Sequence, residues 1–254
     1  MAEHFILLRG LIREAAHWGE FLPKLKSTFP AAHFHCIDIP GAGVHYQTLS
    51  PLTISGIVDR MREDYLALKL SSPAHLIAIS LGGMISVDWM RRYPQDFKTC
   101  VLMNTSFSDY SPVWKRLKPS AFLGLLPAPV QKGYKKEFTI LKTVSNSTSD
   151  YERNANFWSE ITRQRPVSVE NTFRQLLAAS TFKTKGFKPS IPTLILASTN
   201  DRMVNVECSR AIAQKWGVPL SENPTAGHDI TLDAPEWVVA QLTSWSPLKL
   251  DSRD

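Results

Sequence analysis

The sequence predicts an α/β fold with a doubly wound, mostly parallel sheet of about six strands and an inserted helical cap. Short apolar runs rich in β-branched residues recur along the chain, and stretches with helical periodicity separate most of them. Strands that alternate with helices pair in parallel, because each connection must cross the sheet. About ninety residues separate the fourth run from the fifth, far more than a single crossover requires.

The predicted strands are continuous apolar segments, as expected of strands that helices cover on both faces. They span His4–Leu8, His33–Ile37, His75–Ile79, Thr99–Met103, Thr193–Ala197 and Val218–Glu222. The core is therefore expected to be a central sheet with a layer of helices on each side.

The long interval after the fourth strand has helical patterning of its own. Asp150 is placed to cap one helix, and Ser168 is placed to cap a second. The second helix carries apolar residues on one face, namely Phe173, Leu176 and Leu177. We predict a helical cap over residues 107–187, inserted into a core made of residues 1–106 and 188–254.

The composition is that of a globular protein. The chain has 254 residues, of which 43% are apolar and 20% are charged, enough for one large domain or a core with a cap. No apolar stretch reaches the length of a membrane span, and Phe5–Leu8 is too short for a signal peptide. These features favour a cytoplasmic protein and leave the oligomeric state open.

Charge and cysteine content limit the classes of binding partner that the sequence favours. The net charge is +6, but the densest basic run, Lys183 to Lys188, is short and lacks the aromatic array of a nucleic-acid surface. Three cysteines without C-x-x-C spacing argue against a disulfide framework or a zinc site. We expect a small-molecule substrate, with neither nucleic acid nor a membrane as partner.

The strongest chemical signal is a serine between two small residues. Ser80 follows an apolar strand and precedes a helix-compatible run from Met84 to Arg92. A sharp strand-to-helix turn exposes the serine hydroxyl and brings the residues two before and two after it close together. Ala78 and Gly82 are small enough for such a turn. This combination favours a nucleophile over a plain turn with a solvent-exposed serine.

A serine nucleophile needs a base to remove its proton. A histidine base in turn needs an acid that fixes its tautomer and stabilises the imidazolium. His228 lies in a glycine-containing loop after the last predicted strand, where a side chain can point into a shared cleft. Asp201 directly follows the fifth strand. Taken alone, this position is equally typical of a turn aspartate without a catalytic role. The order Ser80, Asp201, His228 favours Asp201 as the acid. Asp229 and Glu207 are the alternatives.

Metal and cofactor motifs are weak. His33 and His35 place two imidazoles on one strand face without an evident third ligand. The segment Gly41 to Gly43 is not a dinucleotide fingerprint, because it follows the second strand and no third glycine comes where it is needed. The sequence therefore predicts no metal and no cofactor.

With these residues in view, the chain resembles the α/β-hydrolase superfamily, among its compact serine esterase-like hydrolases. The segment Leu7–Leu11 with the later Trp18 is similar to the family's first loop, usually H-G-x with a downstream tryptophan. The segment Asp38–Gly43 resembles the family's D-x-P-G-x-G turn, in which Gly41 or Gly43 can take a positive φ.

The resemblance implies an oxyanion hole formed by the backbone N–H groups of Leu11 and Leu81. The sequence also departs from the family pattern. Arg9 stands where histidine is usual, Ala78 replaces a glycine, and the antiparallel hairpin that opens many family sheets is missing.

The implied activity is carboxylic ester hydrolysis through an acyl-enzyme, with Ser80, His228 and Asp201 as the triad. The same groups can serve a thioesterase, an amidase, a C–C bond hydrolase or a lyase, and a hydrolase fold can also act as a ligand receptor. In the predicted cap, Phe122 and Leu125 are expected to line an apolar pocket above Ser80. The alternative is that they only pack the cap.

Overall fold

The computed structural model describes residues 3–147 and 150–248 and contains a parallel sheet. Its strands lie in the order β2-β1-β3-β4-β5-β6, and every pair is parallel. Their bounds are β1 Glu3–Leu8, β2 Ala32–Cys36, β3 Ala74–Ile79, β4 Phe97–Met103, β5 Thr193–Ser198 and β6 Leu220–Asn223. The predicted fold class is confirmed, and each predicted strand overlaps an observed one.

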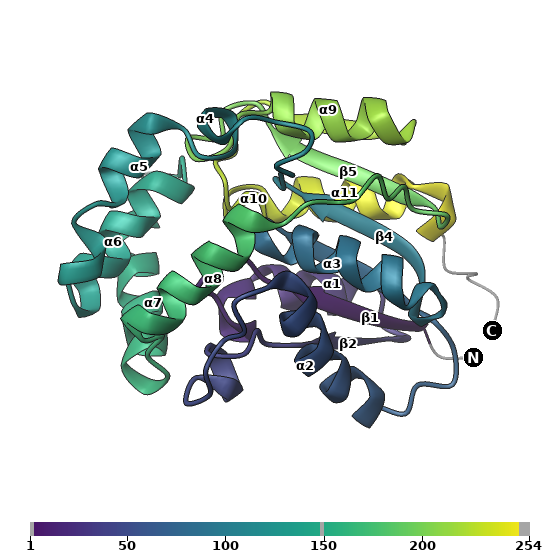
Figure 1. Cartoon of the computed structure of the whole chain (residues 1–254), viewed down its shortest axis with the longest axis horizontal. Helices are drawn as coiled ribbons and strands as arrows, with labels where there is room; N and C mark the ends of the chain where they lie inside the picture. Colours follow the sequence, from purple (N-terminus) through teal and green to yellow (C-terminus); the bar gives the residue numbers. More distant parts are fainter. Residues whose placement is uncertain (1–2, 148–149, 249–254) are drawn as a thin grey trace.

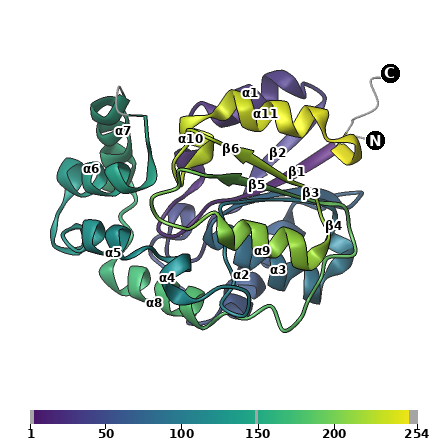
Figure 2. The same ribbon diagram turned by 90° about the horizontal axis from the view of Figure 1, so that it is seen from above.

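Helices cover both faces of the sheet (Figure 2). One face carries α1 (Phe21–Thr28) and α11 (Pro235–Ser244), and the other carries α2 (Ile54–Ala67), α3 (Leu81–Arg92) and α9 (Glu207–Trp216). Side chains of the central strands alternate between two buried apolar clusters, one under each layer. This double burial explains why the strands read as continuous apolar runs.

The segment between β4 and β5 forms helices at the carboxyl end of the sheet (Figure 1). They are α4 Val113–Arg116, α5 Pro119–Leu125, α6 Gly133–Val144, α7 Tyr151–Gln164 and α8 Val169–Thr181. Helices α6 and α7 pack through an apolar cluster of their own, which includes Leu141 and Trp158. All five helices lie within the segment that the sequence assigned to a cap.

Shorter helical turns complete the described chain. They are α10 Ile230–Asp233 and the 3₁₀ turns η1 Ala15–Trp18, η2 Gly43–His45, η3 Pro94–Asp96, η4 Ala128–Val130 and η6 Ser246–Leu248. The turn η2 belongs to the D-x-P-G-x-G segment, where both Gly41 (φ 87°) and Gly43 (φ 53°) take the positive φ expected of them.

Helix α8 has its predicted cap but an unexpected orientation. Ser168 caps it through a hydrogen bond from Asn171 N–H (3.0 Å), and Asp150 occupies the N-cap position of α7. The apolar residues of α8 do share one face, and that face is exposed. The helix buries Asn171 and Gln175 instead, because their amides hydrogen-bond to backbone groups of core loops.

Candidate active site

Ser80 occupies a strained turn between β3 and α3. Its backbone has φ 56° and ψ −119°, a region that residues with a side chain seldom adopt. Neighbouring groups hold it there. Ser80 N–H donates to the Met103 carbonyl (2.9 Å), and the Thr105 hydroxyl donates to the Ser80 carbonyl (2.8 Å). The end of β4 therefore fixes the peptide groups on both sides of Ser80.

Small residues around Ser80 allow two chain segments to meet. A Cβ on Gly82 would lie 2.6 Å from the Leu8 carbonyl oxygen, so this helical position must be glycine for α3 to pack against the end of β1. A Cβ on Gly10 would lie 3.1 Å from the Ser80 Cβ. Since β1 and β3 are hydrogen-bonded neighbours, the loop after β1 passes directly beside the Ser80 side chain.

The structure brings Ser80, His228 and Asp201 together. His228 Nε2 lies 2.9 Å from Ser80 Oγ, and His228 Nδ1 lies 2.7 Å from Asp201 Oδ2. Asp201 Oδ1 accepts hydrogen bonds from the N–H groups of Met203 (2.7 Å) and Val204 (2.9 Å), which orient the carboxylate. Both His228 and Asp201 are buried. In the tautomer that Asp201 selects, Nδ1–H donates to the carboxylate and Nε2 accepts from the serine hydroxyl.

The electrostatic environment of His228 has two opposing parts. Burial disfavours the imidazolium and lowers the pKa of His228. The negative charge of Asp201 and its hydrogen bond to Nδ1 outweigh burial, so the pKa of His228 is raised above its ordinary value of 6.5. The imidazole is therefore a stronger base than a free histidine.

For the predicted reaction with His228 as base, we expect kcat/KM to fall about tenfold per pH unit on the acid side. His228 acts only when neutral, and its raised pKa keeps it protonated up to a higher pH, so the midpoint of the fall should lie above 6.5. Initial rates at constant ionic strength across the pH range check this. A rate that stays flat from roughly pH 5 to 9 would exclude a histidine base.

The alternative acids are engaged elsewhere. Asp229 pairs with the buried Arg9 (Nη2 to Oδ2, 2.5 Å) and caps α10 at Leu232. Burial would raise the pKa of Asp229, but the Arg9 charge and its hydrogen bonds lower it on balance. Glu207 lies at the start of α9 and pairs with Arg210 (2.7 Å). Arg9, which replaces the family histidine, thus ties the loop after β1 to the residue that follows His228.

Sequence reasoning missed two residues that hold the histidine loop. Asn104, at φ 45°, donates to the His228 carbonyl (2.8 Å) and accepts from Ser198 N–H (2.8 Å). Asp233 accepts from the N–H groups of Gly227 and Asn146, both at 2.7 Å. Asn104 could have been found, because an asparagine directly after a strand indicates a turn with positive φ, which Asn tolerates. Nothing in the sequence indicates that Asp233 contacts Asn146 of the inserted segment.

The two residues of the expected oxyanion hole lie on either side of this site. Leu81 is the first residue of α3, and Leu11 follows Gly10 in the loop that passes Ser80. The next residue, Ile12, has φ 53°, and its N–H donates to Gln175 Oε1 of α8 (3.0 Å). Gln175 is fully buried, so α8 anchors the loop that carries the Leu11 amide.

The other inserted helices hold the same loop. Arg13 donates to Glu137 of α6 (2.8 Å), and its guanidinium lies over the Trp158 ring of α7 at 4.1 Å. Glu14 pairs with Arg165 at the end of α7 (2.6 Å). Three separate helices of the insertion therefore restrain the backbone beside Ser80.

The structure places Phe122 and Leu125 on α5. Phe122 is exposed on α5, and Leu125 packs against the apolar cluster of α6 and α7. Neither lines the cavity of about 680 Å³ that borders Asp201 between α5, α6 and the loop after β5. Their role in acyl binding therefore stays a prediction.

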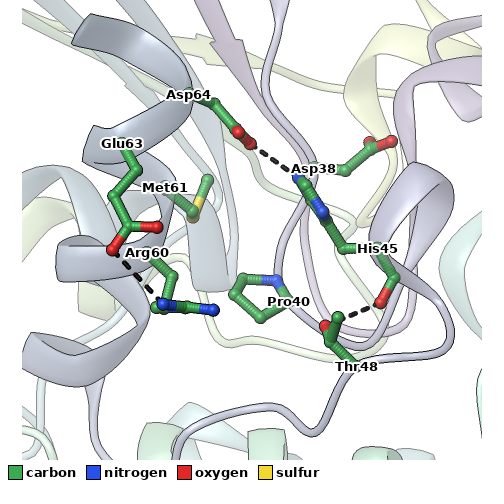
Figure 3. Close-up of a pocket in the computed structure, with 8 residues that line it drawn as sticks. All are labelled: Asp38, Pro40, His45, Thr48, Arg60, Met61, Glu63 and Asp64. Atoms are coloured by element: carbon green, nitrogen blue, oxygen red, sulfur yellow. Dashed lines mark hydrogen bonds and ion pairs between the residues drawn. The ribbon is translucent and has the colours of Figure 1, made fainter. Parts of the chain in front are cut away.

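A second histidine–aspartate pair borders a small cavity (Figure 3). His45 Nε2 is 2.6 Å from Asp64 Oδ2 at the edge of a small cavity of about 60 Å³. The nearby Thr48 hydroxyl donates to the His45 carbonyl and is not presented to the imidazole. Asp38 accepts from the N–H groups of Ala15 and Val44. These contacts give the D-x-P-G-x-G segment a structural role.

The imidazole of His4, on β1, lies beside the imidazoles of His33 and His35. His4 Nδ1 lies 3.1 Å from His35 Nε2, and the His4 ring stacks on His33. Across residues 3–147 and 150–248, no group of three or more His, Cys, Asp or Glu side chains is arranged to hold a metal ion. No helix in these residues is long and apolar enough to cross a membrane.

Comparison with known proteins agrees with this architecture. The family model described as alpha/beta hydrolase fold matches residues 3–235. The chain is 23% identical over 250 residues to monoacylglycerol lipase ABHD6 of Bos taurus, a match that covers 91% of this chain and 71% of the relative.

Solved structures show the same fold at low identity. A hydrolase from Pseudomonas aeruginosa PA01 superposes with a TM-score of 0.75 and 19% identity, covering 98% of this chain and 91% of that one. A thermophilic esterase from Thermogutta terrifontis superposes with a TM-score of 0.73 and 19% identity. The match covers 97% of this chain and 90% of that one. The family match and these relatives support a serine hydrolase enzyme. The chain belongs to the alpha/beta hydrolase fold family.

Proposed function

We propose that the protein hydrolyses carboxylic esters through an acyl-enzyme on Ser80. The observation that carries this proposal is the hydrogen-bonded series Ser80–His228–Asp201, with distances of 2.9 and 2.7 Å. A serine on a strained turn, a buried base and an oriented carboxylate are the parts that acyl transfer requires. The lipase and esterase relatives favour an ester as the substrate class.

The reaction follows from these positions. His228 Nε2 takes the proton of Ser80 as Oγ attacks the ester carbonyl carbon, and the carbonyl oxygen becomes an oxyanion. The N–H groups of Leu11 and Leu81 stabilise that oxyanion. When the tetrahedral intermediate collapses, the ester C–O bond breaks and the alcohol leaves with the proton from His228. The acyl group remains on Ser80.

Deacylation reverses these roles with water. His228 removes a proton from water, which attacks the acyl carbon while the same two amides hold the second oxyanion. Collapse then breaks the bond to Ser80 Oγ, which recovers its proton from His228. Asp201 stabilises the imidazolium during both halves and does not itself become protonated. The acid product then leaves.

A substrate panel tests the proposal. Purified protein is assayed with short and long p-nitrophenyl esters, a thioester and a vinylogous diketone. We expect the highest kcat/KM on an ester, with turnover lost in Ser80→Ala. Turnover confined to the diketone would identify a C–C bond hydrolase, and Ser80-independent background on every substrate would favour a ligand receptor.

Gln175 provides a prediction about the oxyanion loop. Gln175→Met keeps the side-chain size but leaves the Ile12 N–H without its acceptor. Because the carbonyl oxygen gains its negative charge only after the ester is bound and attacked, we expect kcat to fall about tenfold or more with little change in KM. The exposed Gln214→Met on α9 is the matched control. A lower melting temperature with unchanged kcat would show that Gln175 acts only in stability.

A further inference from the structure

The inserted segment exposes an unusual number of large apolar side chains. Among the described residues, sixteen large apolar side chains are exposed, and twelve of them lie between Val113 and Leu177. A surface helix normally turns its polar face outward. Exposed apolar residues gathered on one part of a molecule indicate an interaction surface.

The most concentrated group lies on α4, α5 and η4, and we call it the docking face. It consists of Trp114, Phe122, Leu123, Leu126 and Val130, which are 54% to 85% exposed. Another side of α5 already packs on the protein, since Ala121 is buried and the partly buried Leu125 contacts the apolar cluster of α6 and α7. The outward apolar residues are therefore not needed to hold α5 on the protein.

Basic residues lie in the same stretch of sequence as the docking face. Residues 113–136 contain six basic side chains and no acidic one, namely Lys115, Arg116, Lys118, Lys132, Lys135 and Lys136. The other 23 basic residues of the chain are matched by 23 acidic residues, so this one segment accounts for the whole net charge of +6. The next acid, Glu137, is buried and bonded to Arg13 and Thr162, which leaves the surface lysines uncompensated by it.

We propose that the docking face binds the surface of a membrane that contains anionic lipids. Trp, Phe and Leu side chains flanked by lysines are the composition of a segment that lies in the lipid interface. The apolar side chains would enter the acyl boundary, and Lys132 and Lys135 would contact the headgroups. This is peripheral binding, consistent with the lack of a membrane-spanning helix in the described residues.

Other occupants fit the same residues less well. A second copy docked face to face would bring two uncompensated basic segments together, which repel each other. A protein partner would normally meet an interface depleted in lysine. Nucleic acid would account for the lysines but not for exposed leucines. An anionic lipid surface satisfies both the apolar and the basic side chains.

The docking face is also connected to the reactive end of the sheet. Lys118, which precedes α5, donates from Nζ to the Asp201 carbonyl (2.5 Å), and its N–H donates to the Met203 carbonyl (2.8 Å). Helix α5 lies at the end of the molecule where the strands terminate (Figure 1). Membrane binding is nevertheless independent of the proposed reaction, so Ser80→Ala is expected to bind vesicles like the native protein.

Vesicle sedimentation tests the proposal. The full chain is mixed with vesicles of phosphatidylcholine alone or with added phosphatidylserine, and the bound fraction is measured at low and high salt. We expect binding only with phosphatidylserine, weakened by salt. The double variant Leu123→Ser with Leu126→Ser should bind about tenfold more weakly, and so should Lys132→Glu with Lys135→Glu.

Two matched double variants serve as controls. Leu49→Ser with Leu52→Ser removes exposed leucines elsewhere, and Lys183→Glu with Lys185→Glu reverses exposed lysines elsewhere. Both pairs should bind like the native protein, and melting temperatures verify folding. Equal binding to both vesicle types, no binding, or docking-face variants that bind normally would overturn the proposal. A concentration-dependent dimer lost in the leucine variant would assign the face to a second copy instead.

Discussion

Ser80→Ala is expected to reduce ester turnover by roughly 10⁵-fold or more and to abolish covalent labelling by a fluorophosphonate. The structure gives His228 Nε2 one hydroxyl to activate, at 2.9 Å, and alanine removes it. The fold should persist, because the hydrogen bonds that hold position 80 involve its backbone N–H and carbonyl rather than its side chain.

The control for this variant lies in α3, the helix that follows Ser80. Ser86→Ala removes a buried hydroxyl that donates to the Gly82 carbonyl within α3 (2.8 Å). It should keep both labelling and turnover within a few-fold of the native values. Labelling that survives in Ser80→Ala, confirmed by peptide mapping at another residue, would show that the nucleophile lies elsewhere.

Asp201→Asn is expected to lower kcat by about 10⁴-fold with a folded protein. The asparagine oxygen can still accept from the N–H groups of Met203 and Val204, so the loop after β5 should keep its shape. The imidazole loses the charge that raises the pKa of His228. Any residual activity should therefore show its acid-side fall at a lower pH than in the native enzyme.

Two comparisons separate Asp201 from the alternative acids. Glu207→Gln alters an exposed ion pair with Arg210 and should leave kcat unchanged. Asp229→Asn weakens a buried pair with Arg9 and should lower the melting temperature more than Asp201→Asn does. A folded Asp229→Asn with crippled kcat, beside a mild Asp201→Asn, would assign the acid to Asp229.

The sheet and the three polar side chains at its edge could be predicted from the sequence because their signals are local. Each strand is an uninterrupted apolar run, and Ser80 sits between Ala78 and Gly82 within a few residues of a strand and a helix. Asp201 and His228 lie in the loops that follow β5 and β6. Parallel pairing then brings all three to one edge.

The supporting contacts could not be predicted, because they join distant parts of the chain. Gln175 reaches Ile12 across 163 positions, and Asp233 reaches Asn146 across 87. Helical periodicity identified the apolar face of α8 but not its direction. That direction depends on the buried amides of Asn171 and Gln175, which find backbone partners only in the folded core.

The exposed surface of the insertion was the largest difference from expectation. Along the sequence, the apolar stretch around Phe122 and Leu125 is typical of a pocket wall as well as of packing. The structure turns Phe122 outward and buries Ala121 instead. A short helix of mostly apolar residues carries no periodic signal that distinguishes its two sides.

Trapping the acyl-enzyme tests the central claim most directly. The protein is mixed with a p-nitrophenyl ester, quenched in acid during turnover, digested and examined by mass spectrometry. We expect the acyl group of the substrate on the peptide that contains Ser80 in the native protein and in Asp201→Asn, and no such adduct in Ser80→Ala. Ester turnover with the acyl group on another residue, or with no acyl adduct at all in either protein, would contradict catalysis by the Ser80–His228–Asp201 series.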